Sequence, residues 1–100
     1  MKAYILIKDS IPTGKAIVAA AHASLAMYLK FQDHPDVIAW LAGSFAKVIC
    51  KVSDNEFEAA KGYEDNIVLT ESSLGGIEVA LAFRPREEWT KEFQFFKLYK

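Results

Sequence analysis

A lysine and a histidine stand seven residues apart in the alanine-rich segment "GKAIVAAAHASLAMY", residues 14–28. At 3.6 residues per turn, this spacing places Lys15 and His22 on nearly the same face of a helix, two turns apart. An amine and an imidazole on one face can bind an anion or transfer a proton. The segment therefore predicts a helix with a candidate catalytic or binding pair, and the plainer alternatives are a solvated lysine and a structural histidine.

The position of Lys15 argues against a plain helix start. Lys15 falls in the first turn of the expected helix, where the helix dipole is positive and disfavours a cation. A nucleotide-binding phosphate loop is excluded, because that motif needs a glycine five residues before the Gly-Lys pair and Ser or Thr after it. Asp9 and Ala16 occupy those two positions.

The composition indicates one globular domain over residues 1–100, with charge divided unevenly along it. Residues 1–51 hold six lysines against three aspartates, whereas residues 52–100 hold six basic against ten acidic residues. The amino-terminal half can therefore present a modest basic face. The formal net charge of −1 is not that of a dedicated nucleic-acid-binding domain.

The single cysteine, Cys50, excludes a disulfide framework and a cysteine zinc site, and its apolar surroundings favour a buried strand position. We expect no metal and no cofactor. No apolar stretch approaches the ~20 residues that span a membrane, and the N-terminus lacks a signal-peptide pattern. A cytoplasmic location is expected.

Four apolar runs predict strands, and the segments between them predict helices. The run at 3–7 is continuous rather than alternating, which is typical of a strand covered on both faces. A helix over 14–32 follows it, and further strands are predicted at 46–52, 66–70 and 77–83. This alternation predicts an α/β fold, with a three-layer α/β/α arrangement around a four-stranded mixed sheet.

Within the 14–32 helix, apolar side chains recur at the three-to-four spacing of a buried stripe. The stripe predicted to face the core consists of Ile17, Ala21, Leu25 and Tyr28. Several alanines make this helix thin, so that a strand or a substrate can approach its backbone closely.

Shorter elements have local signals of their own. Asp33 or His34 can cap a second helix that has a proline in its first turn. Ser53 and Glu56 have the spacing of a capping box. The closing "FFKLY" predicts either a short edge strand or a docked tail.

The segment "AYILIKDSIPTGKAIVAAAHASLAMY" resembles the opening of the archaeal and eukaryotic type of peptidyl-tRNA hydrolase, the second family of that name. Its members begin with an apolar strand, a Gly-Lys-Gly-Lys-like turn and a helix of small residues that leads into His-Ala. Lys15 matches the lysine that the family uses in catalysis. The resemblance continues through "HPDVIAWLAGSFAKVICKV", "IEVALAFRP" and "FKLY". It implies the family's fold and its reaction, hydrolysis of the ester that joins a peptide to the terminal ribose of tRNA.

The loop after the third predicted strand departs from the family pattern. Where members read roughly Asp-Ala-Gly-Arg-Thr-Gln, this chain has the shorter "TESSLGG", residues 70–76. Glu71 best matches the family's aspartate, Ser72 or Ser73 can replace its threonine, and its arginine has no counterpart. The chain thus resembles a divergent, bacterial-like member.

The resemblance implies a role for each of these groups. Glu71 orients a water molecule, Lys15 stabilises developing charge or moves a proton, and Ser72 or Ser73 donates a hydrogen bond. His22 supports the site from the helix face. Lys15 and Glu71 should line one cleft where the helix begins and the third strand ends.

Peptidyl-tRNA is the implied partner, with Lys8, Lys15 and Lys30 expected on one surface against the acceptor-stem phosphates. A homodimer is also implied, because the family's members are often dimers. Two other interpretations stay open. The chain can be a relative that binds without catalysis, or a hydrolase of another ester or amide.

Overall fold

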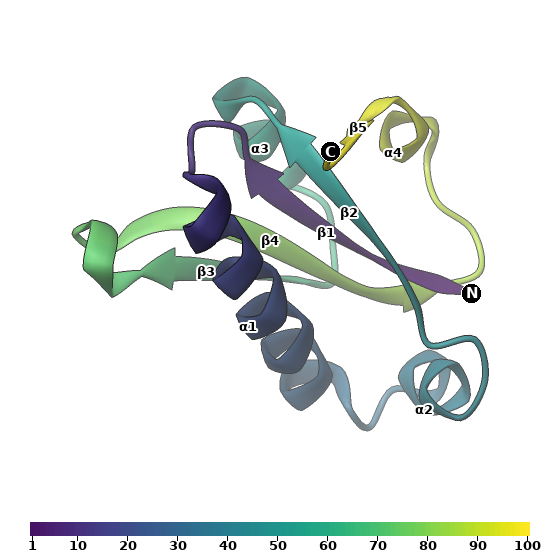
Figure 1. Ribbon diagram of the computed structural model, residues 1–100. Coiled ribbons are helices and arrows are strands. Elements are labelled where there is room, and N and C mark those ends of the chain that lie inside the picture. The colour runs from purple at the N-terminus through teal and green to yellow at the C-terminus, as the bar shows by residue number, and fades with distance from the viewer.

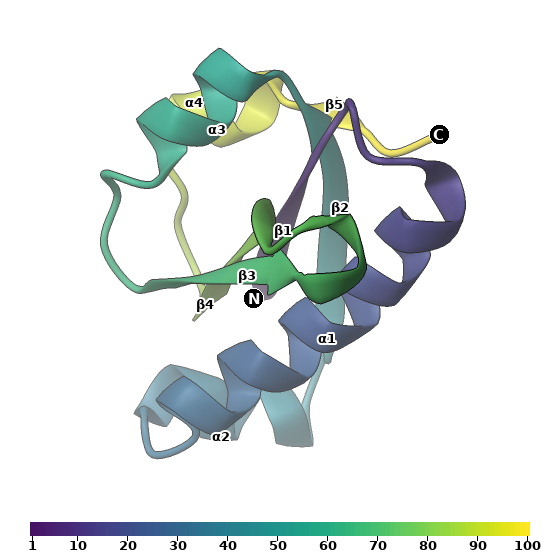
Figure 2. The same cartoon turned by 90° about the vertical axis from the view of Figure 1, so that its left-hand side faces the viewer.

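One five-stranded sheet forms the centre of the structure, and helices lie on both of its faces. The computed structural model describes residues 1–100. Two helices, α1 and α2, pack on one face, and α3 and α4 pack on the other (Figure 2). The elements, in chain order, are β1 (Lys2–Lys8), α1 (Thr13–Phe31), α2 (Pro35–Ala42), β2 (Ala46–Val52), α3 (Asp54–Ala60), β3 (Asn66–Glu71), the 3-10 helix η1 (Ser72–Leu74), β4 (Ile77–Arg86), α4 (Lys91–Phe95) and β5 (Lys97–Leu98). The α/β class, the four predicted strand positions and the long helix are confirmed.

The strands lie in the order β3-β4-β1-β2-β5 (Figure 1). β1 and β2 run parallel, and every other neighbouring pair is antiparallel. The predicted number of four strands is wrong, because Lys97–Leu98 pairs with Lys51 and Cys50 and adds a fifth strand. β1 is parallel to β2, and β1 and β3 are both antiparallel to β4. The carboxyl-terminal ends of β1, β2 and β3 therefore lie at the same end of the sheet. We call it the carboxyl end.

The continuous apolar run of β1 is explained by its central position. Alternate side chains of this strand enter two separate cores. Ile5 and Ile7 pack beneath α1, whereas Tyr4 and Leu6 pack against α3 and α4. All five residues over 3–7 are buried, as the sequence predicts for a strand covered on both faces.

Both short-helix caps form as predicted. His34 Nδ1 accepts a hydrogen bond from the backbone N–H of Asp36 at 3.0 Å, and a proline follows His34 in the first turn of α2. In α3, Ser53 Oγ accepts from the backbone N–H of Glu56 at 3.1 Å, and Glu56 Oε1 accepts from the backbone N–H of Ser53 at 2.8 Å. These two reciprocal hydrogen bonds between Ser53 and Glu56 form a capping box.

The buried stripe predicted on α1 is wrong. Ile17 and Leu25 are 66% and 59% exposed, respectively. The sheet instead meets a row of small side chains that ends in a methionine: Ala16, Ala19, Ala23 and Met27. Because α1 is apolar around most of its circumference, periodicity alone could not identify the packed face. The alanine row allows the closest approach of helix to sheet.

Arg84 in β4 is a buried charged residue that sequence reasoning missed. Its Nη1 donates to Asp36 Oδ2 and to the carbonyl of Pro85, both at 3.0 Å. Its Nε donates to Asp65 Oδ2 at 3.1 Å. Asp65 lies in the turn before β3 with a φ of 64°. One guanidinium therefore ties β4 to the start of α2 and to that turn.

We expect Arg84→Ala to lower the free energy of unfolding by about 2 to 4 kcal/mol, because several charge-assisted hydrogen bonds disappear together. Urea denaturation measures this change. Arg86→Ala is the matched control, since Arg86 makes one ion pair, with Asp65 at 3.3 Å, and lies over the Trp89 ring, so its loss should cost under about 1 kcal/mol. Equal losses for the two variants would contradict a special role for Arg84.

Candidate functional site

Lys15 and Glu71 both lie at the carboxyl end of the sheet. Lys15 is the third residue of α1, which begins soon after β1 ends, and Glu71 is the last residue of β3. Figure 1 shows the start of α1 and the η1 turn at this same end. The fold therefore places Lys15 and Glu71 at the same end of the sheet. Between Lys15 and its C-terminus, α1 packs across β4 and β3.

The Glu71 carboxylate is held by the turn that follows it. Glu71 Oε2 accepts hydrogen bonds from the backbone N–H of Ser73 at 3.0 Å and from Ser73 Oγ at 2.8 Å. Gly75 and Gly76 complete the turn at φ values of 79° and 78°, which favour glycine. The backbone N–H of Gly76 donates to the carbonyl of Glu71 at 2.9 Å. The shortened loop is thus tightly hydrogen-bonded and fixes the carboxylate.

The pKa of Glu71 is lowered from its usual value. The largest cause is the hydrogen bond from the backbone N–H of Ser73, followed by the bond from its hydroxyl. The positive charges of Lys15 and His22 also lower this pKa, while desolvation opposes the change. Glu71 is therefore a carboxylate at neutral pH, and its charge responds to both predicted residues of α1.

The two serines of the loop differ in their bonding. The hydroxyl of Ser73 donates to Glu71, so Ser73 holds the carboxylate. The Ser72 side chain is exposed and makes no hydrogen bond, so its hydroxyl is free to donate to a ligand. The structure distinguishes two residues that the sequence left equivalent.

The start of α1 offers backbone donors beside Lys15. Pro12 stands at the N-cap, no side chain caps the helix, and the first turn contains no acidic residue. None of the chain's ion pairs involves Lys15. Unpaired N–H groups and an ammonium at a helix start attract negative charge. His22 is also exposed and follows two turns later, about 10 Å along the helix axis.

The three lysines predicted to bind tRNA do not share one surface. Lys8 Nζ lies 4.8 Å from the ring centroid of Phe57, a residue of α3, on the other face from α1. Lys30 lies in the last turn of α1, about 22 Å along the axis from Lys15. Its Nζ donates to the carbonyl of Asn66 at 2.9 Å. Of the three, only Lys15 contributes to the lowered pKa of Glu71.

The candidate site is an open surface rather than a cavity. None of the five hollows in the structure is lined by Lys15, His22 or Glu71. No group of three or more His, Cys, Asp or Glu side chains is arranged to hold a metal ion. No helix is long and apolar enough to cross a membrane.

The family model of the peptidyl-tRNA hydrolase PTH2 matches residues 1–90. The chain belongs to this family. A search of the curated proteins finds no match. The matched residues include every element from β1 to β4, and therefore Lys15, His22 and the "TESSLGG" loop. Family membership is thus shown over the part of the chain that carries the candidate site, whereas α4 and β5 lie beyond the matched residues.

In a peptidyl-tRNA hydrolase with this site, the charge of Glu71 should govern the acid side of the pH–rate profile. We expect Ser73→Ala to shift the acid limb of kcat/KM to higher pH, because one hydrogen bond that favours the carboxylate is lost. The backbone N–H of residue 73 still donates, so the shift is partial. The measurement is kcat/KM against pH.

Ser72→Ala is the matched control for this pH experiment. It removes a neighbouring hydroxyl that does not contact the carboxylate, so the acid limb should stay in place. An unchanged limb in Ser73→Ala, with wild-type folding confirmed by circular dichroism, would contradict the assignment of this limb to Glu71.

Proposed function

We propose that this PTH2 family member hydrolyses the ester that joins a peptide to the terminal ribose of tRNA. The observation that carries the proposal is geometric: Lys15 near the start of α1 and the hydrogen-bonded Glu71 carboxylate at the end of β3 lie at the same end of the sheet, with His22 two turns further along α1. These are three of the residues implied by the family resemblance. The match to the family over residues 1–90 supports the same reaction.

The chemistry divides among three side chains. The Glu71 carboxylate accepts a hydrogen bond from a water molecule and directs the water oxygen at the ester carbon. The Lys15 ammonium and the Ser72 hydroxyl stabilise the negative charge that develops on the carbonyl oxygen. The water oxygen bonds to the ester carbon, the bond from that carbon to the ribose oxygen breaks, and the proton lost by the water passes to the ribose oxygen. The products are a free peptide carboxyl group and a tRNA with its terminal hydroxyl restored.

Ser73 and His22 act as positioning residues in this proposal. Ser73 holds one oxygen of Glu71, which leaves Oε1 for the water. His22, two turns beyond Lys15 in α1, helps to lower the pKa of Glu71 and so favours its carboxylate form. No metal or cofactor takes part, and the reaction is proposed to occur in the cytoplasm. Among the predicted tRNA contacts, Lys15 belongs to the site, while Lys8 and Lys30 stay predictions.

The test is incubation of the pure protein with peptidyl-tRNA and measurement of the released peptide and deacylated tRNA. Turnover above the uncatalysed rate supports the proposal. Tight binding without release would contradict it and would favour a non-catalytic binding module. Cleavage of small esters or amides without cleavage of peptidyl-tRNA would favour a hydrolase of another substrate.

We also propose that two copies of the chain associate through the outer side of α1 and α2. Seven large apolar side chains are exposed here, and we call this surface the α1–α2 face. Its members are Ile17, Val18, Leu25, Leu29, Ile38, Leu41 and Phe45. No lysine, arginine, aspartate or glutamate occurs between Lys15 and Lys30. Such an uncharged centre is typical of an interface between subunits.

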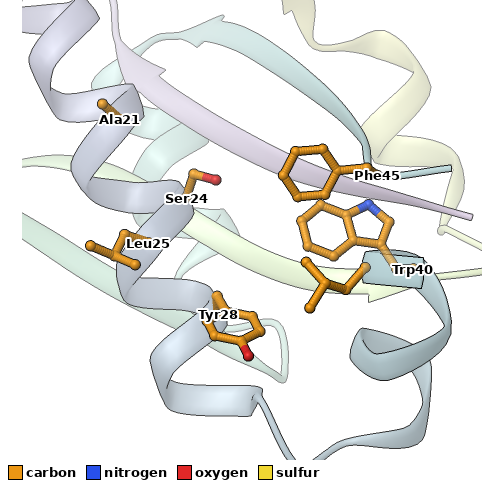
Figure 3. Close-up of a pocket in the computed structure, with 7 residues that line it drawn as sticks. Ala21, Ser24, Leu25, Tyr28, Trp40 and Phe45 are labelled. Carbon is orange, nitrogen blue, oxygen red and sulfur yellow. The ribbon is translucent and has the colours of Figure 1, made fainter. Parts of the chain in front are cut away.

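The α1–α2 face also has a hollow that can receive a protruding side chain. A hollow of about 280 Å³ lies between α1 and α2, lined on one side by Leu25 and Tyr28 and on the other by Trp40 and Phe45 (Figure 3). A second copy, related by a two-fold axis, presents the same projections and the same hollow. The apolar side chains exposed on this face therefore favour a homodimer.

A further inference from the structure

Three lysines gather at the corner of the sheet where β2 meets β5. Lys51 of β2 stands directly opposite Lys97 of β5 in the strand register. Together with Lys100 and Leu98, they line a hollow of about 520 Å³. We call these three lysines the basic corner. None of them belongs to the tRNA contacts predicted from the sequence, and no acidic residue lines the hollow.

The positive charge of the basic corner is not neutralised within the chain. None of its lysines takes part in an ion pair. Like charges directly opposite each other on neighbouring strands are destabilising. Lys51 Nζ lies 4.6 Å from the ring centroid of Tyr99, a cation–π contact that does not neutralise the charge of the ammonium. In a chain of net charge −1, this arrangement is a local concentration of positive charge that suits a polyanion.

The basic corner lies at the same end of the sheet as the candidate site. Lys51 is the next-to-last residue of β2, and β5 begins with Lys97 because it runs antiparallel to β2. β3 lies three strand spacings from β2, about 14 Å, and four strand spacings from β5, about 19 Å. An extended anion that has one end at Glu71 can therefore reach the corner.

We propose that the basic corner binds the sugar–phosphate backbone of the RNA whose 3′ end occupies the candidate site. This inference rests on the proposed function. Lysines recognise phosphates as point charges, so this contact depends on the backbone and not on the base sequence of the RNA. The alternative is that these lysines only protect an exposed edge strand from pairing with another chain.

The test measures binding of a short RNA hairpin that has a single-stranded 3′ end, as a function of salt. The variant is Lys97→Gln with Lys100→Gln, which removes two exposed charges from the corner. Each phosphate contact contributes about 0.9 to the slope of log K against log salt, so the slope should fall by about 1 to 2. Affinity at low salt should fall about tenfold.

The matched control removes two exposed lysines elsewhere, Lys2→Gln with Lys91→Gln, and keeps the same total charge. This control should bind the hairpin nearly as the wild type does. Equal affinity and equal slope for the two double variants would overturn the proposal. Displacement of the hairpin by polyglutamate at matched charge would also overturn it, because the corner would then bind any polyanion.

Hydrolysis separates this inference from the proposed function. A peptidyl ester of a single nucleoside carries no phosphate and is too short to reach the corner, so the corner variant should cleave it as the wild type does. With full-length peptidyl-tRNA, the same variant should show a raised KM and a nearly unchanged kcat. Wild-type protein that cleaves neither substrate would contradict the proposed function, while the hairpin measurement still decides the basic corner.

Discussion

Lys15→Ala should lower kcat/KM for peptidyl-tRNA roughly a hundredfold or more, the usual effect of losing one oxyanion donor or acid–base group. The Lys15 side chain is exposed and makes no ion pair, so no acidic residue of the chain neutralises its charge. Its charge already acts on the Glu71 carboxylate in the free protein. Steady-state hydrolysis assays on the purified variant measure the loss.

Stability should hardly change in Lys15→Ala. A cation in the first turn opposes the helix dipole, so its removal alters the free energy of unfolding by only tenths of a kcal/mol. Lys91→Ala is a control at another exposed lysine in the first turn of a helix, because Lys91 begins α4 on the opposite face of the sheet from α1. Near-normal hydrolysis by Lys15→Ala would show that Lys15 is only a solvated residue at a helix start.

A role in phosphate binding alone would give a third pattern. Lys15→Ala would then bind tRNA more weakly and with a shallower dependence on salt, while turnover at saturation stayed nearly intact. That result would contradict oxyanion stabilisation by Lys15. Rate, affinity against salt and melting temperature, measured on this one variant, separate the three roles.

The positions of the main elements could be predicted because their signals are local. The apolar run of β1, the Ser53–Glu56 capping box and the helical spacing after Gly14 each lie within a few residues of the chain. The fifth strand could not be predicted with the same certainty. Lys97 and Leu98 form a strand only because they meet the edge of β2, a contact that is distant in sequence.

The orientation of α1 was the main error at the sequence level. An amphipathic helix reveals its packed face, but α1 has apolar residues nearly all round. The prediction chose the larger side chains, including Ile17 and Leu25, for the core. In the structure the alanines face the sheet, because small side chains let the helix approach β1, β4 and β3 closely. The larger side chains are left at the surface.

The candidate site could be predicted in its residue types but not in its bonding. Seven-residue spacing placed Lys15 and His22 on one side of α1, and chain order placed Glu71 at the end of β3. The distinction between Ser72 and Ser73 depends on the geometry of a turn with two glycines at positive φ. Neither spacing nor composition encodes which hydroxyl meets the carboxylate.

The exposed side of α1 leads to the second large expected effect, on association. Leu25→Asp should weaken the proposed homodimer at least hundredfold, because a two-fold interface buries the new carboxylate twice without a partner. Leu25 is 59% exposed in the single chain, so the fold itself should tolerate the change. Sedimentation velocity across a range of protein concentrations measures the shift from dimer to monomer.

Phe95→Asp is the matched control for association. Phe95 is 79% exposed on α4, across the sheet from the α1–α2 face. Its replacement introduces the same charge as Leu25→Asp, also at an apolar surface position. This variant should associate as the wild type does, because its substitution lies outside the proposed interface. A wild-type chain that stays monomeric at every concentration would contradict the homodimer. A dimer that survives Leu25→Asp but dissociates in Phe95→Asp would instead place the interface on the α4 side of the sheet.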